Sequence, residues 1–299
     1  MAYPIVEGVA DNVGGIDAVS HTANMPAGVV AGETLILAVA SYYDGSAANS
    51  FNTPAGWTRG FEYKQPYVSL EFFYKTAGGS ESTVSLTPVR PEATSYCHSY
   101  RVSGTDGIEF GTVAFQDVSA SADTVTAPTI TPSWSGDTLY MFVGGGGRTN
   151  ALFSSLPAGY TTQDGVSGEN AGGRGISLAS GYKNSDGSAE SPGDLVLATY
   201  NLIAANTIAI KGAGPIPPSV TVTQTELTPG GTISGSYSDY ATVPTTLTVS
   251  DGTNTITIAS PTINDNGDGT GTFSGTMPSL PTSGTANLIL FGNVTVELS

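Results

Sequence analysis

The stretch Tyr67-Val-Ser-Leu-Glu-Phe-Phe-Tyr74 decides the fold class of this chain. Every second side chain is apolar, and successive side chains of a β-strand point to opposite faces. One face would therefore meet a core, while the face that carries Ser69 and Glu71 would meet solvent. The stretch predicts a half-buried strand whose core face carries Val68, Leu70, Phe72 and Tyr74.

Two further runs, residues 34–40 and 139–143, are apolar without interruption. Such short runs are typical of strands that are covered on both faces. The sequence shows no sustained apolar spacing of three and four residues, which would mark an amphipathic helix, and β-branched residues recur throughout. The chain is therefore predicted to be all-β, with these two runs in its core.

The composition agrees with this prediction. Of 299 residues, 39 are Gly and 18 are Pro, and only 11% are charged against about 25% in typical domains. Hydrophobic residues, at 39%, are too many for a disordered chain, which combines low hydrophobicity with dense charge. The chain should fold, with little helix.

The charge balance excludes several partners. Lys and Arg number 9 against 25 Asp and Glu, and the net charge of −16 would repel nucleic-acid phosphates and anionic membranes. No apolar run approaches the roughly 20 residues of a membrane helix. The opening residues Met-Ala-Tyr-Pro-Ile-Val-Glu-Gly lack the basic start and apolar block of a secretion signal, so we expect assembly in a cytoplasm.

Thiols and imidazoles are too few for two common kinds of site. Cys97 is the only cysteine, so no intrachain disulfide can form, and with only His21 and His98 a Cys/His zinc site is excluded. We expect no cofactor. Cys97 and His98 are neighbours in an expected strand, so their side chains should diverge rather than form a catalytic pair. Cys97 is predicted to be a small buried residue, and His21 a turn or loop residue.

An internal repeat organises the first two thirds of the chain. We predict that residues 1–213 form one jelly-roll-like β-sandwich from two related halves, about 20–104 and 125–212, because pairing the copies would cover the open face of each. Two separate small sandwiches are the alternative. The matching segments are Gly32-Glu-Thr-Leu-Ile-Leu with Gly136-Asp-Thr-Leu-Tyr-Met, Pro54-Ala-Gly-Trp-Thr58 with Pro157-Ala-Gly-Tyr-Thr161, Tyr74-Lys75 with Tyr182-Lys183, and Val102-Ser-Gly104 with Ile210-Lys-Gly212.

The segment Ala213-Gly-Pro-Ile-Pro-Pro-Ser219 ends the repeat. Proline fixes φ and favours an extended spacer, so residues 214–218 are predicted to be a linker. Residues 219–299 carry short alternating segments and the hairpin signal Asp251-Gly252, and they predict a small immunoglobulin-like β-sandwich that lacks the Cys and Trp signature of antibody domains. The expected strands are residues 220–223, 232–237, 246–250, 254–258 and 288–291.

Two features suggest catalysis or phosphate binding, but neither has the required spacing. The run Gly144-Gly-Gly-Gly147 lacks the Lys-Ser/Thr of a phosphate loop and is predicted to be a mobile loop, as is the stretch 165–175. A glycosidase needs a pair of carboxylates, but no spacing singles out a pair here, so we predict solvated faces for all the candidates. These candidates are Glu33, Glu62, Glu71 and Glu81.

Oxygen-bearing side chains alternate at Asn264, Asn266 and Asp268, as they do in calcium loops. The Glu that closes an EF-hand loop is missing. Because Asn, Asp and Gly are also the usual residues of turns, a hairpin turn is favoured over a calcium site, and no metal is predicted.

Trp57 and Tyr160 occupy equivalent places in the two copies, directly after Pro-Ala-Gly. Exposed aromatic residues on loops often contact sugars or protein partners, and a repeated aromatic can equally fill a core. Packing is the favoured interpretation, and contact with a ligand or partner is the open alternative.

Several segments together resemble a β-sandwich module of structural proteins from tailed bacteriophages. The resemblance covers about residues 20–212, and the carboxy-terminal part is similar to immunoglobulin-like modules of capsid, head-fibre and tail proteins. The resemblance of residues 20–212 implies a scaffold without a catalytic residue, and that of the carboxy-terminal part implies weak contacts with bacterial surface glycans. The segments that carry it are Met25-Pro-Ala-Gly-Val-Val-Ala-Gly-Glu-Thr-Leu, Thr53-Pro-Ala-Gly-Trp-Thr58, Phe73-Tyr-Lys-Thr-Ala-Gly-Gly-Ser-Glu81, Tyr100-Arg-Val-Ser-Gly104, Pro157-Ala-Gly-Tyr-Thr161 and Pro192-Gly-Asp194.

The leading functional hypothesis is a non-enzymatic virion surface protein, assembled in the host cytoplasm. We expect a capsid decoration protein or head fibre that docks on other virion proteins, either the major capsid protein or tail components, as a homotrimer. A tail fibre or adsorption protein that binds host-surface carbohydrate is the alternative, and it rests on Trp57, Tyr160 and the tyrosine-rich stretches Tyr42-Tyr43 and Tyr63-Lys-Gln-Pro-Tyr67. An enzyme and a bacterial adhesin are weaker hypotheses, because the sequence shows neither a carboxylate pair nor an export signal.

Overall fold

A computed structural model describes fourteen stretches of the chain, and every structural statement below concerns these residues. They form an all-β protein, as predicted, and contain no helix long and apolar enough to span a membrane. Part of the expected linker, residues 215–218, lies outside them, as do Asp251, Gly252 and Asp268. The described ranges are 3–43, 48–90, 93–117, 124–147, 152–167, 175–197, 202–214, 219–223, 229–238, 243–250, 253–267, 270–278, 288–292 and 294–297.

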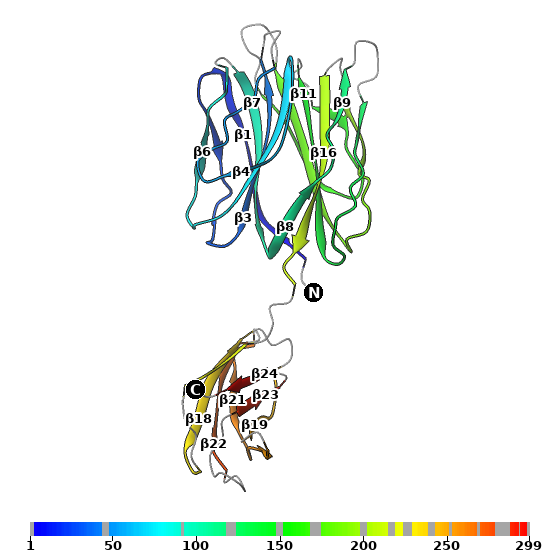
Figure 1. The fold of residues 1–299 in the computed structure, drawn as a ribbon. Coiled ribbons are helices and arrows are strands. Elements are labelled where there is room, and N and C mark those ends of the chain that lie inside the picture. The colour runs from blue at the N-terminus through cyan, green and yellow to red at the C-terminus, as the bar shows by residue number, and fades with distance from the viewer. Residues whose placement is uncertain are drawn as a thin grey trace. The chain divides into compact units, whose positions relative to one another are not determined.

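The chain divides into two compact units, Met1–Gly214 (unit 1) and Pro215–Ser299 (unit 2). Unit 1 contains two large antiparallel sheets that run alongside each other (Figure 1). The first has the strand order β1-β7-β3-β5-β4 and the second the order β8-β16-β11-β14-β13. The first sheet consists of β1 (Ile5–Ala18), β7 (Ala93–Ser103), β3 (Thr34–Tyr42), β5 (Val68–Thr76) and β4 (Thr58–Gln65). The second consists of β8 (Thr105–Phe110), β16 (Leu202–Gly212), β11 (Thr138–Gly147), β14 (Ile176–Ser185) and β13 (Thr161–Val166), and β9 (Ala114–Asp117) also pairs with β16.

The two large sheets share one hydrophobic core. Leu70 of the first sheet and Met141 of the second are both fully buried in it, so the halves form a single sandwich rather than two. At a typical 1.5–3 kcal/mol for each fully buried apolar side chain, this shared layer contributes more to the stability of unit 1 than any other cluster of its described residues. Its buried members are Ile36, Ala38, Ala40, Tyr42, Val68, Leu70, Phe72, Tyr96, Tyr100, Val102, Leu139, Met141, Val143, Ile176, Leu178, Ala204, Ile208 and Ile210.

A smaller sheet covers the outer face of each large sheet. The pair β2 (His21–Asn24) and β6 (Thr83–Leu86) packs on the first, and β10 (Thr124–Ala127), β15 (Gly193–Leu197) and β12 (Phe153–Ser155) pack on the second. Residues 34–40 and 139–143 are therefore buried on both faces, as predicted. The prediction of a half-buried strand at residues 67–74 was wrong, because this outer layer also buries Ser69, Glu71 and Phe73.

Strand pairing aligns the two halves residue by residue and corrects one match of the repeat. Thr34 lies opposite Val102, whereas Leu139 rather than Thr138 lies opposite Ile210. The sequence match pairs Thr34 with Thr138, which is one residue away from the structural equivalent Leu139. An error of one residue assigns every side chain of the strand to the wrong face. The other matches keep their places in the pairing: Thr58 and Thr161 lie opposite Tyr74 and Tyr182, and Val102 is equivalent to Ile210.

The glycine run 144–147 is the second half of β11 and is fully buried, not a mobile loop. A Cβ on Gly144 or Gly146 would overlap the leucines of β15, and a Cβ on Gly147 would overlap the carbonyl oxygen of Tyr67. Layers press on both faces of this strand, so glycine fits where any other residue would collide. Gly165, expected in a loop, lies in β13 with Tyr96 packed against it.

Unit 2 consists of two four-stranded antiparallel sheets around its own core. All five expected strands are present, and β21, β22 and β24 were not predicted. The core includes Phe273 and Phe291, whose rings stack with centroids 4.9 Å apart. One sheet holds β17 (Ser219–Val222), β18 (Thr232–Ser238), β22 (Gly271–Thr276) and β21 (Thr262–Asp265), and the other holds β20 (Thr255–Thr257), β19 (Leu247–Ser250), β23 (Leu288–Phe291) and β24 (Val294–Glu297).

Candidate functional site

Trp57 and Tyr160 both lie half-buried against the outer cores of unit 1. Trp57 packs on the cluster that contains Phe73, and its amide donates a hydrogen bond to the Pro54 carbonyl, 3.1 Å away, which closes the turn. Tyr160 meets the ring of Phe142 edge to face, with centroids 5.1 Å apart. Both aromatic residues therefore fill space between a large sheet and the segments that cover it.

The polar end of Tyr160 is also engaged. Its hydroxyl donates a hydrogen bond to Glu190 Oε1 at 2.8 Å, and the ammonium of Lys183 lies 4.9 Å from the ring centroid. Lys183 and Glu190 form an ion pair at 2.8 Å. Burial, together with the Glu190 carboxylate, raises the pKa of Tyr160. This arrangement stabilises the turn, and it leaves little of Tyr160 to contact a ligand.

The Cys97 and His98 side chains diverge, as predicted. Cys97 is buried in the outer cluster, where burial raises the pKa of its thiol to about 12, so a reactive thiolate is disfavoured. His98 points into the shared core, with its Nδ1 2.6 Å from Ser180 Oγ. His21 is not a turn residue as expected: it begins β2 and is buried, with its Nδ1 2.6 Å from Ser95 Oγ.

The expectation that all four glutamates lie on solvated faces was wrong for two of them. Glu71 is fully buried on β5, because the segment before β4 covers it: its Oε1 accepts a hydrogen bond from the Phe51 amide at 2.8 Å. Burial raises the pKa of Glu71 to about 8. Arg59 bridges Glu71 and Glu62, which lie directly opposite each other. Glu33 is 8% exposed and lies 3.7 Å from an Arg101 nitrogen.

Of the suspected calcium motif the structure describes Asn264, which lies in β21, and Asn266, which lies between β21 and β22. Asn266 bonds to Thr270 through both its amide and its side chain, at 3.0 Å in each case, and the Asp265 carboxylate accepts a hydrogen bond from the Gly267 amide at 2.9 Å. Asn264 pairs with Thr272 in the strand ladder. In the part of the chain that the structure describes, no group of three or more His, Cys, Asp and Glu residues could hold a metal.

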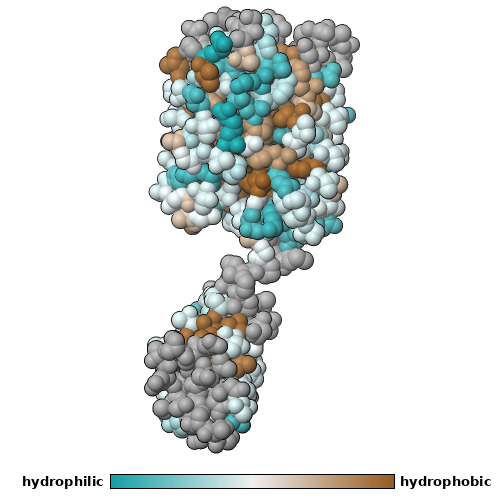
Figure 2. Space-filling model, in the orientation of Figure 1, coloured by the Kyte–Doolittle hydropathy of each residue, from teal (hydrophilic) through white to brown (hydrophobic). Residues whose placement is uncertain are grey.

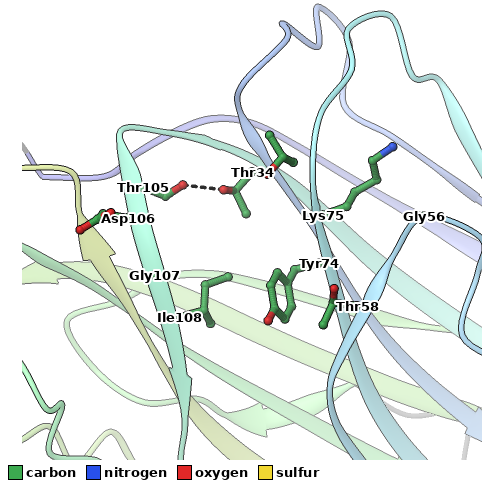
Figure 3. A pocket seen from close by; sticks show the side chains of 10 residues that line it. Thr34, Gly56, Thr58, Tyr74, Lys75, Thr105, Asp106, Gly107 and Ile108 are labelled. Carbon is green, nitrogen blue, oxygen red and sulfur yellow. Dashed lines mark hydrogen bonds between the residues drawn. The ribbon is translucent and has the colours of Figure 1, made fainter.

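A cleft of about 390 Å³ opens where β4 and β5 of the first sheet meet β8 of the second (Figure 3). The Tyr74 ring and Ile108 lie near each other across it, and Thr58 stands beside the ring. At one end, Thr34 Oγ1 and Thr105 Oγ1 are hydrogen-bonded at 2.5 Å. The remaining lining residues are Gly56, Lys75, Thr76, Asp106 and Gly107. We call this space cleft 1.

The opposite pair of edges, β13 and β1, forms a second cleft of about 320 Å³, which we call cleft 2. Strand pairing makes most of its residues equivalent to residues of cleft 1, and the repeated Pro-Ala-Gly turn adds the two glycines. From the repeated strands the equivalent pairs are Thr34 and Leu139, Gly56 and Gly159, Thr58 and Thr161, Tyr74 and Tyr182, Lys75 and Lys183, and Thr76 and Asn184. From the edge strands, Gly107 and Ile108 correspond to Ile5 and Val6, and Asp106 and Pro4 precede these pairs in the chain.

An ion pair holds the lysine beside each cleft. Lys75 Nζ lies 3.0 Å from Glu81 Oε1, and Lys183 pairs with Glu190 in the same way in the second copy. Hydrogen bonds from the Gly78 amide and from Lys75 lower the pKa of Glu81 to about 2, so its charge persists to low pH. Each cleft therefore offers hydroxyls and one aromatic ring, with its lysine charge already compensated.

Sequence reasoning located these clefts only in part. Both Pro-Ala-Gly turns were singled out, but Gly56 and Thr58 line the cleft while Trp57 points into the outer layer. The Tyr-Lys repeat marks Tyr74 and Tyr182 in the sequence, but by itself it indicates duplication and not a cleft. Partly buried hydrophobic residues of β4, β8 and β9 continue along the same edges, and Figure 2 shows hydrophobic side chains gathered on the face where β4, β8 and β16 lie in Figure 1.

Comparison with known proteins found no matching protein family, no matching curated protein and no matching solved structure. The class that fold and site define is an all-β protein with a duplicated sandwich and two equivalent surface clefts.

Proposed function

We propose that this chain is a non-enzymatic surface protein of a bacteriophage particle, most specifically a capsid decoration protein or head fibre. Unit 1 docks on the major capsid protein or on tail components, and unit 2, which we assign to the immunoglobulin-like class, is displayed. The assembled form is a homotrimer, since particle proteins of this kind sit on symmetry axes. Assembly takes place in the host cytoplasm.

The observation that carries this proposal is the four-layered unit 1, in which an outer sheet covers each face of a shared core. Such a body offers a rigid surface for docking, and a second unit with its own core can be exposed without cost to the first. The sequence resemblance to phage sandwich modules and the net charge of −16, which suits a position outside a DNA-filled shell, support the same role.

The test is immunogold labelling of particles from a lysate with antibody to the purified chain. We expect gold distributed over the heads. Antibody that has been pre-absorbed with the chain is the control, and light scattering of the purified chain measures whether it is a trimer. Particles without gold would overturn the proposal.

A tail fibre or adsorption protein that binds host carbohydrate is the second candidate, and clefts 1 and 2 favour it. Gold confined to tail tips would support this candidate against a head position.

A further inference from the structure

We propose that clefts 1 and 2 are two equivalent binding sites for neutral saccharide rings, with Tyr74 and Tyr182 as the stacking surfaces. This inference deepens the second candidate function and rests on it for the source of the saccharide. The binding itself is a property of unit 1, and its test is independent of where the chain lies on a particle.

The composition of cleft 1 matches the two kinds of surface on a sugar ring. A pyranose presents a C–H face, which packs against an aromatic ring, and hydroxyls at its edge, which exchange hydrogen bonds with side chains. In Figure 3 the Tyr74 ring and Ile108 supply the apolar part, and Thr58 lies at the rim of the ring. The hydroxyls of Thr34 and Thr105 supply further partners at the end of the cleft.

Cleft 2 repeats this composition with different residues at some positions. The Tyr182 ring is again half-buried, Leu139 and Val6 provide the apolar wall, and Thr161 and Asn184 provide polar groups. Both volumes lie at the lower end of the roughly 300–1,000 Å³ of small-molecule sites, which suits a single ring in each cleft.

The charges around the clefts select a neutral ligand. Lys75 and Lys183 are held by Glu81 and Glu190, and Asp106 is held by Lys211 at 2.6 Å. A phosphate or carboxylate would have to compete with these carboxylates for the lysines. The net charge of −16 further disfavours an anion.

Comparison of the two copies shows which residues the clefts have in common. The copies keep Gly, Thr, Tyr and Lys at four cleft positions, whereas several interior positions of the sandwich have changed. A positive φ, 78° at Gly56 and 81° at Gly159, explains the glycines. Tyr74 and Tyr182 also pack against the shared core, since Tyr74 contacts Phe110 and Tyr182 contacts Tyr100 with ring centroids 6.1 Å apart in each pair. Thr58 and Thr161 are exposed, so core packing does not account for them. The changed pairs are Phe61 and Gln163, Phe72 and Ser180, His98 and Asn206, and Tyr100 and Ile208.

The experiment is an amide NMR titration of the full chain with methyl glycosides of glucose, galactose and N-acetylglucosamine. Glucuronic acid is the charged counterpart of the glucose probe. We expect at least one neutral glycoside to shift the Gly56 and Thr58 amides and the Gly159 and Thr161 amides, with affinities in the millimolar range that is usual for small ligands in shallow sites. Glucuronic acid should bind more weakly than the glucoside.

Variants assign the binding to each cleft without disturbing the core. Thr58→Arg and Thr161→Arg place a long side chain in cleft 1 and cleft 2 from exposed first positions of β4 and β13. Each should abolish the shifts in its own cleft only, and the double variant should abolish both. Thr83→Arg, at the exposed first position of β6, is the matched control and should bind like the parent.

Three outcomes would overturn the inference: no neutral glycoside shifts either set of amides, the double variant binds as well as the parent, or glucuronic acid binds more tightly than the glucoside. Thermal melts of each variant confirm that it is folded. If gold labels the heads and a saccharide binds, the saccharide site is supported and the tail position is rejected. If gold labels the tail tips and no saccharide binds, only the saccharide site is rejected.

Discussion

His98 joins the two halves of unit 1 through a buried polar contact. Ser180 Oγ of the second half lies 2.6 Å from His98 Nδ1 and 2.5 Å from the Tyr100 hydroxyl, and all three residues are buried. His98 Nε2 has no hydrogen-bond partner among the described residues. The equivalent residue in the second half is Asn206, which cannot titrate. A proton on His98 would therefore be buried, and the Asp11 carboxylate on the facing position of β1 would offset only part of that cost.

The first prediction concerns acid stability. Burial lowers the pKa of His98 from 6.5 to about 4. Between these two pH values the unfolded chain binds a proton at His98 and the folded chain does not. The stability from neutral His98 is fully present above about pH 6.5 and is lost as the pH falls towards 4, by roughly 3 kcal/mol in all. His98→Asn should flatten this part of the profile of unfolding free energy against pH, measured by urea denaturation.

Ser180→Ala is the control for this prediction. It removes the same hydrogen bond but keeps the titrating ring, so it should lower the unfolding free energy at every pH and leave the acid slope unchanged. A His98→Asn variant with the parent's slope between pH 6.5 and 4 would contradict the assignment.

The second prediction separates packing from binding at Trp57. Because its ring packs half-buried on the outer core, Trp57→Ala should cost about 2–3 kcal/mol of unfolding free energy, less than for a fully buried ring. Trp57→Phe should recover most of this loss. The folded fraction of Trp57→Ala should still bind any saccharide that the parent binds, because the ring points away from cleft 1. Loss of binding in folded protein would instead give Trp57 a direct ligand contact.

At the scale of the strands, the two pairs of facing edges fill their space in opposite ways. Where β4 meets β8, large rings of the first sheet and β8 pack together: Phe61 and Phe110 lie 5.9 Å apart between centroids, and Phe72 and Phe110 lie 5.4 Å apart. Where β13 meets β1, Gly165 and Ser180 leave room for Tyr96 and Tyr100 of β7. The duplicated strands thus keep their pairing, but the large side chains differ in position. They come from β4, β5 and β8 at the first pair of edges and from β7 at the second.

The third prediction tests the glycine strand. A Cβ on Gly147 would overlap the Tyr67 carbonyl oxygen, a backbone atom that cannot rotate away. Gly147→Ala should therefore cost about 1–3 kcal/mol, although alanine is ordinarily better than glycine in a strand. Gly214→Ala, where an added Cβ meets nothing within 4 Å, is the control and should stay within about 0.5 kcal/mol of the parent. Thermal melts followed by circular dichroism measure both, and a neutral Gly147→Ala would show that the strand has room.

The sequence predicted the buried runs 34–40 and 139–143 and five strands of unit 2, because uninterrupted apolar runs and short alternating segments favour strands. It did not predict β21, β22 and β24. It was insufficient for Gly144 and Glu71, whose surroundings come from other strands: β15 presses on Gly144, and the segment around Phe51 covers Glu71. The one-residue shift between Thr34 and Leu139 was equally hidden, since it is defined by pairing with β7 and β16.

The candidate site, too, depends on residues from other strands that the sequence does not bring together. The Pro-Ala-Gly turn and the Tyr-Lys pair are visible in the sequence, but each cleft exists only because an edge strand of the other sheet, β8 or β1, lies beside them. Ile108 and Val6 carry no sequence signal of a site. Only the packing of two sheets in one sandwich brings such residues to Tyr74 and Tyr182.

At the scale of the whole molecule, the two units should unfold separately. Each has its own core, and among the described residues the unit 2 core has nine buried hydrophobic members, which makes it the smaller of the two. Within unit 1 the halves share their central layer, so the sandwich should melt in one cooperative step. Calorimetry of the full chain is therefore expected to show two transitions, the larger of which belongs to unit 1.

The fourth prediction follows from where the cores lie. Residues 1–214 expressed alone should fold and melt at the temperature of the larger transition, because they keep the shared core and both outer layers. Residues 1–104 should not fold, although they contain a five-stranded sheet and its cover, because removal of β11, β14 and β16 would expose the inner face that carries Ile36, Leu70 and Tyr100. An apolar face of that size is rarely stable in water. Amide NMR spectra distinguish the two outcomes, and dispersed peaks with a cooperative melt for residues 1–104 would show that each half is a domain in its own right.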